Sequence, residues 1–164
     1  GREILQWNGT NWLRVSHPFE NNLDTSFDDI YMLSTTDGWA TGSTFEDNKW
    51  KAIILHWDGA SWLQITITSE NFPSSFYMLS PAEGWAVGWY GTILRWDKTS
   101  WSQIPSPTGN TLRSVYMLSQ NEGWAVGASG TIIHWNGTSW SQVTSPTEND
   151  LLDIFMLSPT ESYV

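Results

Sequence analysis

The chain has 164 residues, with 7 Lys and Arg against 17 Asp and Glu, which gives a formal net charge of −10. Nucleic acids and anionic lipid surfaces bind clustered basic side chains, so this charge argues against both partners. No apolar run approaches the ~20 residues that span a bilayer, and without Cys there is no disulfide or thiolate chemistry. We therefore expect one acidic domain over residues 1–164, without nucleic-acid binding or membrane insertion.

In chain order, residues 1–16 contain two short apolar runs separated by Asn8-Gly9, a dipeptide typical of hairpin turns. Residues 17–66 contain four such runs and an insertion between Gly42 and Ile54 that carries Trp50. The acidic side chains of this unit lack the Asp, Asn and Gly spacing of a calcium loop, so we interpret them as solvated, with calcium as the alternative. The pattern predicts two strands in residues 1–16 and four in residues 17–66.

Two nearly regular repeats follow, residues 67–105 and 106–144, with a period of 39 residues. Of the 39 positions from Tyr77 to Val115, 24 are identical to those from Tyr116 to Ile154. Each repeat again has four short runs rich in β-branched and aromatic residues, bounded by Gly, Asn and Pro. In Asp97-Lys98 the Gly of the hairpin turn is missing, so we expect another turn type there. Residues 145–164 contain only the first two runs.

Four antiparallel strands per repeat of about 40 residues predict an all-β fold, a β-propeller of four blade equivalents with almost no helix. Residues 1–16 supply the third and fourth strands of one blade, and residues 145–164 supply the first and second strands. These complementary halves indicate either closure through a shared blade or an arc of a larger ring. A solenoid of stacked hairpins is the weaker alternative.

The run from Glu83 to Leu94, with Glu-Gly-Trp-Ala-Val-Gly and then Gly-Thr-Ile-Leu, resembles the propeller repeats of the photosystem II assembly/stability factor family. It also resembles the bacterial neuraminidase (Asp-box) repeat group. The segments His56–Trp62 and Arg95–Trp101 resemble shortened forms of the Asp-box of that group. The resemblance covers the whole chain except that Glu161–Val164 departs from the pattern. It implies a propeller, and since such families have more blades, it implies an oligomer or a fragment. It does not specify an activity.

The chain has 13 Trp, and eleven of them recur at three equivalent positions of the repeat, which indicates core packing. Trp50 and Trp89 lie outside these series, and Tyr90 follows Trp89 where the next repeat has Ala128-Ser129. Aromatic side chains on turns suit sugar stacking or a protein contact. Trp50, Trp89 and Tyr90 are therefore the predicted ligand-binding residues, with capping of a blade edge as the alternative.

Catalytic chemistry is not indicated. The four Arg are spread over different turns and strands and do not form the cluster that a sialidase needs. No two carboxylates stand out as a glycosidase pair. Glu83 and Glu122 recur beside Gly, so we interpret them as turn residues. His56 and His134 share one repeat position on separate blades and would not converge on a metal ion. We expect no enzyme, no metal and no cofactor.

The sequence thus predicts a non-catalytic propeller module that binds a glycan or a peptide through loop aromatics or grooves between blades. The alternative is a structural or assembly element that self-associates into a larger ring or holds a protein client. The resemblance to bacterial sensor and adhesion ectodomains implies an extracytoplasmic or secreted location.

Overall fold

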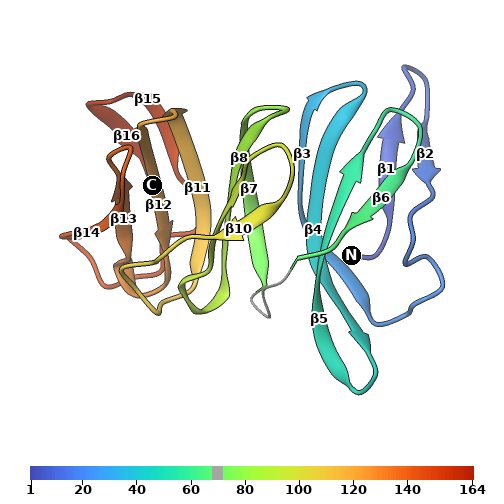
Figure 1. The fold of residues 1–164 in the computed structure, drawn as a ribbon, viewed down its shortest axis with the longest axis horizontal. Helices are drawn as coiled ribbons and strands as arrows, with labels where there is room; N and C mark the ends of the chain where they lie inside the picture. Colours follow the sequence, from blue (N-terminus) through green and yellow to red (C-terminus); the bar gives the residue numbers. More distant parts are fainter. Residues whose placement is uncertain (68–71) are drawn as a thin grey trace.

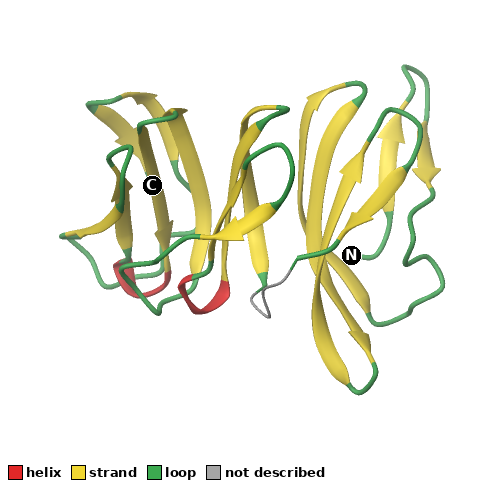
Figure 2. Ribbon diagram, viewed as in Figure 1, coloured by secondary structure: helices red, strands yellow, loops and turns green. Residues whose placement is uncertain are grey.

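A computed structural model describes residues 1–67 and 72–164 of the chain, so part of the predicted junction between units 17–66 and 67–105 lies outside the described residues. The described residues form strands joined by turns, with two single-turn 3-10 helices, η1 (Trp89–Gly91) and η2 (Ala128–Gly130) (Figure 2). None of the described helices has the length and apolar character to cross a bilayer. The strands are β1 (Ile4–Trp7), β2 (Trp12–Val15), β3 (Thr25–Ser34), β4 (Asp37–Glu46), β5 (Lys49–Trp57), β6 (Trp62–Ile65), β7 (Pro73–Ser80), β8 (Glu83–Gly88), β9 (Ile93–Trp96), β10 (Trp101–Gln103), β11 (Leu112–Ser119), β12 (Glu122–Gly127), β13 (Ile132–Trp135), β14 (Trp140–Val143), β15 (Phe155–Ser158) and β16 (Glu161–Tyr163).

The strands form three antiparallel four-stranded sheets, β3-β4-β5-β6, β7-β8-β9-β10 and β11-β12-β13-β14, with two-stranded sheets β1-β2 and β15-β16 beside them. Because each sheet follows sequence order, every repeat is one meander, and the predicted all-β propeller is confirmed. The sheets follow one another around an arc, with β1-β2 at one end and β15-β16 at the other (Figure 1). In the described residues no strand pairing joins the two ends, so the structure is an open arc.

The first strands of successive sheets lie side by side and form the inner side of the arc, as an aromatic ladder across them shows. The ring of Tyr77 lies between those of Tyr31 and Tyr116, at centroid distances of 5.7 and 4.7 Å, and Phe155 follows Tyr116 at 5.3 Å. These four aromatics occupy one repeat position. The repeat therefore places one ring per blade in a continuous row.

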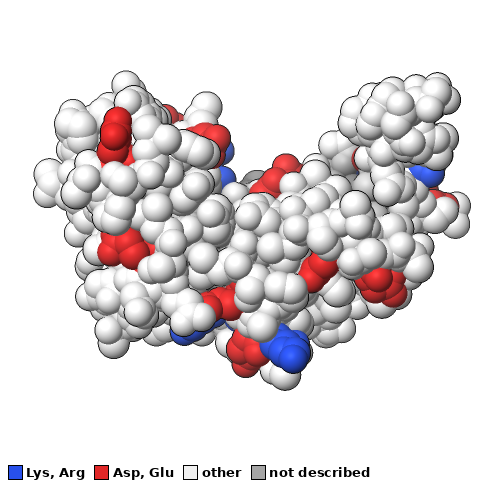
Figure 3. Space-filling model, turned by 90° about the horizontal axis from the view of Figure 1, so that it is seen from above, with Lys and Arg blue, Asp and Glu red and all other residues white. Residues whose placement is uncertain are grey.

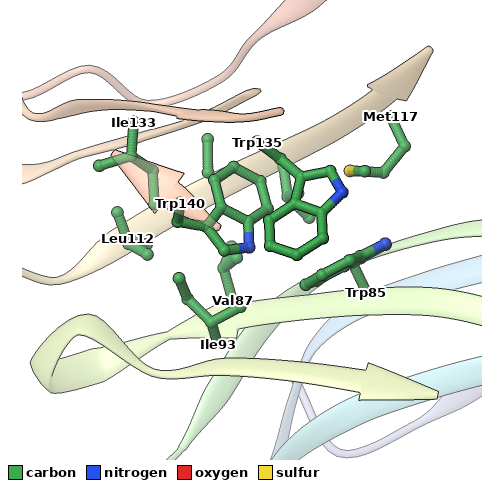
Figure 4. Close-up of a cluster of buried hydrophobic side chains, with 10 residues drawn as sticks. Trp85, Val87, Ile93, Leu112, Met117, Ile133, Trp135 and Trp140 are labelled. Atoms are coloured by element: carbon green, nitrogen blue, oxygen red, sulfur yellow. The ribbon is translucent and has the colours of Figure 1, made fainter. Parts of the chain in front are cut away.

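The two boundaries between complete blades are each filled by Trp residues from both sides. Between the second and third complete blades, Trp85 of β8 packs against Trp135 and Trp140 of the next blade, at ring-centroid distances of 4.8 and 5.5 Å (Figure 4). Trp39 makes the equivalent contacts with Trp96 and Trp101. Large rings supply the apolar area that strands of four residues cannot supply alone. This confirms core packing for the Trp series within the complete blades, whereas Trp7 and Trp12 of the β1-β2 sheet are exposed.

The turns differ from the expectation in one respect. The Asn-Gly and Asp-Gly hairpins are four-residue loops in which only the second residue has positive φ, such as Gly9 at 96° and Gly59 at 95°. Lys98 takes the same conformation, with φ 79°, so the prediction of another turn type at Asp97-Lys98 is wrong. The Asp97 side chain holds the loop by accepting bonds from the amides of Thr99 and Ser100 at 2.9 Å, which keeps the geometry without Gly.

Candidate functional site

A groove of about 710 Å³ lies where the inner strands β3, β7 and β11 begin, and it spans the three complete blades and reaches Leu152 of the last half blade. The arc curves around a hollow, which is visible when the molecule is seen from above (Figure 3). All three predicted ligand-binding residues line this one groove. Its wall is formed by Ser26, Asp28, Ser43, Trp50, Phe72, Ser74, Trp89, Tyr90, Thr111, Arg113 and Leu152.

Trp50 lies on a strand and not on a turn, which corrects the expectation for the insertion. The inserted residues lengthen β4 and β5 into a projecting hairpin that closes at Asp47-Asn48, where φ is 52° and 62°. Two successive positive φ angles are typical of a type I′ turn. The Trp50 ring packs edge-on against Phe45 of the opposite strand, 5.4 Å away, and 56% of Trp50 stays exposed. The hairpin thus holds one face of an indole toward the groove.

Trp89 and Tyr90 form the turn η1 on the neighbouring blade. The amide of Trp89 donates to the carbonyl of Phe72 at 3.0 Å, and Thr92 donates through its amide and its hydroxyl to the carbonyl of Trp89. Tyr90 has φ 56°, a left-handed conformation that a Tyr adopts only when neighbouring bonds hold it. The anchored turn leaves Trp89 and Tyr90 51% and 71% exposed, so two large rings are presented on a fixed support.

Two charged groups of the groove were missed by the sequence analysis. Asp28 and Arg113 occupy the same repeat position, three residues before the ladder aromatic, where the other units have Ser74 and Leu152. Burial raises the pKa of Asp28. Arg113 pairs with Asp150 at 2.8 Å. The signal that marks them is variation at an inner-strand position inside an otherwise regular repeat.

A second set of polar residues is structural. His134 of β13 lies over Trp124 of the adjacent strand, 4.4 Å between ring centroids, and its Nε2 is 2.8 Å from Oε1 of Glu122. Asp37 and His56 repeat the arrangement at 3.1 Å, and Glu83 and Arg95 at 2.7 Å. The interpretation of Glu83 and Glu122 as mere turn residues is therefore incomplete, because each carboxylate bonds to the Arg or His side chain that stacks on a Trp of the adjacent strand. In the described part of the chain no three metal-ligating side chains gather.

No family model and no curated protein matches the chain. Solved structures that it resembles include YCF48 bound to a D1 peptide, with a TM-score of 0.57, 15% identity, and coverage of 94% of this chain and 64% of that one. YCF48 from Cyanidioschyzon merolae has a TM-score of 0.56 and 12% identity, and the match covers 98% of this chain and 73% of that one. The WD40 repeats of RRP9 have a TM-score of 0.59 and 11% identity, with coverage of 79% of this chain and 42% of that one.

The chain thus spans less than two thirds of the length of the peptide-bound YCF48 structure. At these identities the similarity shows the fold alone. It supports propeller repeats like those of YCF48 and WD40 proteins, and it does not support the Asp-box neuraminidase group.

Proposed function

We propose that the chain is a non-catalytic interaction module that holds an extended peptide segment in the groove. The observation that carries this proposal is that Trp50, Trp89 and Tyr90, which come from two different blades, all line the groove. Exposed aromatic rings on fixed supports are typical of the residues that dominate protein contacts. The groove also crosses the inner strands, so a peptide lying in it would contact several blades at once.

The charges of the groove support a peptide over a glycan. A carboxylate at Asp28 and a guanidinium at Arg113 lie on different inner strands, and a peptide offers groups of both signs to them. Sugar stacking needs the aromatic faces alone, so glycan binding is the alternative. The similarity in fold to a YCF48 structure that contains a peptide is consistent with peptide binding.

A non-catalytic role is supported by the carboxylates that recur in the repeat. Asp37, Glu83 and Glu122 are each engaged with a His or Arg of the same blade, and none of the three lines the groove. An extracytoplasmic or secreted location and a bacterial source are part of the proposal only through the resemblance to sensor and adhesion ectodomains. A location experiment with a fusion reporter tests them separately.

Two experiments test ligand binding in the groove. A display library of random 12-residue peptides is selected on the immobilised chain, and the same chain is applied to a glycan array. We expect selected peptides whose binding falls at least tenfold in Trp50→Ala and in Trp89→Ala, with unchanged melting temperature because both rings are already half exposed. Leu63→Ala is the control, since this apolar side chain is 47% exposed and lies outside the groove. Peptides that bind both groove variants as well as the parent, or binding to glycans alone, would refute the proposal.

Self-association, the second candidate role, is favoured by a separate observation. Apolar positions that are buried or partly buried at internal blade boundaries are exposed at both ends of the arc, such as Met32 and Leu157 at 47% and 58%.

A further inference from the structure

The two ends of the arc are the two halves of one blade. The sheet β1-β2 corresponds to the third and fourth strands of a complete blade such as β3-β4-β5-β6, and β15-β16 corresponds to its first and second strands. Both halves present a free strand edge, since in the described residues β1 pairs only with β2 and β16 only with β15. A pairing of β16 with β1 would reproduce the strand order of the complete blades.

A hollow of about 570 Å³ lies beside β1-β2, where a complete blade has its first and second strands. It is lined on one side by Trp7 and Trp12, and on the other by Ile30 and Met32. Ile30 and Met32 are 49% and 47% exposed, although the residues at the same repeat positions in the next blade are 3% and 2% exposed. The apolar surface of this blade is therefore built for a cover that the β1-β2 half alone does not provide.

The next blade boundary shows what the cover is. There Phe76 and Met78 pack in one cluster with Trp39, and Tyr31 and Leu33 pack against that cluster from the preceding blade. The Trp39 ring contacts Trp96 at 4.8 Å and Trp101 at 5.4 Å. An aromatic and a Leu from a first strand, with an aromatic from a second strand, thus fill each internal boundary.

The β15-β16 end carries this same set of side chains, and within the described part of the chain they are left exposed. Phe155 and Leu157 occupy the positions of Tyr31 and Leu33, and Tyr163 occupies the position of Trp39. They are 54%, 58% and 63% exposed. The two ends therefore match one another as the two sides of an internal blade boundary do. One end has the apolar hollow, the other has the side chains that would fill it, and each has a free strand edge.

We infer that β15-β16 of a second copy of this chain docks in the hollow beside β1-β2 and completes a four-stranded blade. The pairing of β4 with β5 sets the register, which places Tyr163 of one copy opposite Gln6 of the other and Ser162 opposite Trp7. Such contacts are head-to-tail, and they close when the rotation per copy permits. Two copies with four blade equivalents each would form a ring of about eight blades, within the usual range.

Solution mass tests this association without reference to any ligand. Light scattering after size exclusion should give about twice the 18.6 kDa of one chain. Met32→Lys in the hollow and Leu157→Lys on the docking hairpin should each lower the mass at micromolar concentration, with folding checked by circular dichroism because both side chains are half exposed. Trp50→Ala should keep the parent mass, which separates this inference from peptide binding in the groove. A parent of 18.6 kDa at 100 μM, or a doubled mass that neither Lys variant changes, would overturn the inference.

Mixing separates head-to-tail docking from a symmetric contact. A Met32→Lys chain retains its docking hairpin and a Leu157→Lys chain retains its hollow, so an equimolar mixture should form a 1:1 pair through the one intact interface. Because the chain has no Cys, Gln6→Cys and Tyr163→Cys chains give a clean cross-link. Oxidation should link only the two different variants, and cross-linked pairs of a single variant would contradict the proposed register.

Discussion

The ring of Tyr77 lies 4.7 Å from that of Tyr116, centroid to centroid, across the boundary between two blades. Burial raises the pKa of Tyr77 well above its ordinary value near 10, and the neighbouring Tyr116 hydroxyl adds to the shift. Burial also raises the pKa of Tyr31 on the other side. The ladder is therefore built for neutral phenols, because ionisation would place a phenolate in a half-buried, aromatic environment.

The first prediction concerns alkaline pH. A pKa that is raised in the folded state gives a stability contribution that is present below the unfolded pKa of about 10 and is lost as pH rises above it. Tyr77→Phe removes this titration, so its alkaline unfolding midpoint should lie higher than that of the parent, with little change at pH 7. Circular dichroism between pH 9 and 12 measures it. Tyr90→Phe, at a ring that is 71% exposed, is the control and should follow the parent. Coincident curves for parent and Tyr77→Phe would contradict the assignment.

The second prediction concerns a close backbone approach at Gly127, the last residue of β12. A Cβ at Gly127 would lie 2.1 Å from the carbonyl oxygen of Thr111, which also accepts a bond from the Ala128 amide at 2.8 Å. Gly127→Ala must therefore displace backbone and should lower the free energy of unfolding by about 2–3 kcal/mol, as overpacking does. Urea denaturation measures it.

Gly109→Ala is the matched control for Gly127→Ala. No atom lies within 4 Å of a Cβ at Gly109 in the described structure, so this change should be neutral or stabilise by up to about 1 kcal/mol through the unfolded chain. Equal losses in the two variants would show that the Thr111 contact is not the cause.

The third prediction follows from the turn at Lys98. Its φ of 79° matches that of the Gly in the equivalent loops, and a side chain is strained in this region. Lys98→Gly should therefore raise the free energy of unfolding by about 0.5–1 kcal/mol. This is the strain that Gly relieves in the folded state, minus the cost of the extra conformational entropy that Gly gives to the unfolded chain. Gly9→Lys, where φ is 96° and a Cβ has open space, should lower it by a similar amount. Thermal denaturation of both variants decides the question, and a Lys98→Gly variant that is less stable than the parent would reverse the argument.

The repeat made the fold predictable because every blade has the same apolar and aromatic positions, which pack against the next blade in the same way. The position of Trp85 in the repeat indicated a buried ring, and the structure places it between two Trp of the next blade. The Lys98 turn was predicted wrongly because side-chain bonds from Asp97 fix a loop that local propensity alone would not favour. Local rules give the place of a turn more reliably than its dihedral angles.

The site was only half predictable. Trp50, Trp89 and Tyr90 stood out as exceptions to the repeat, but their convergence depends on the curvature of the arc, which no local pattern encodes. The insertion that carries Trp50 was predicted as a loop because its many polar residues obscure the alternation of polar and apolar side chains that is typical of strands. Asp28 and Arg113 were missed because variation at an inner-strand position becomes meaningful only once the first strands are known to face the hollow.

The last prediction uses two Trp that differ in one hydrogen bond. Trp96 and Trp101 are 8% and 5% exposed and lie 5.6 Å apart, so their replacement by Phe removes similar apolar contacts. The indole of Trp96 donates to the carbonyl of Pro81 at 3.1 Å, whereas in the described residues the buried indole nitrogen of Trp101 has no partner. Trp96→Phe leaves a carbonyl without its donor, and Trp101→Phe removes a polar group that gains nothing from burial.

Trp96→Phe should therefore lower the free energy of unfolding by about 1 kcal/mol more than Trp101→Phe, measured by urea denaturation with equal m values. The next blade offers an independent replicate, since Trp135 donates to the carbonyl of Gln120 at 3.0 Å while Trp140 is unpartnered within the described chain. The same order should hold for Trp135→Phe against Trp140→Phe. If the Trp without a hydrogen bond proves the more costly to replace in both blades, ring packing and not the indole bond sets the stability of the boundary.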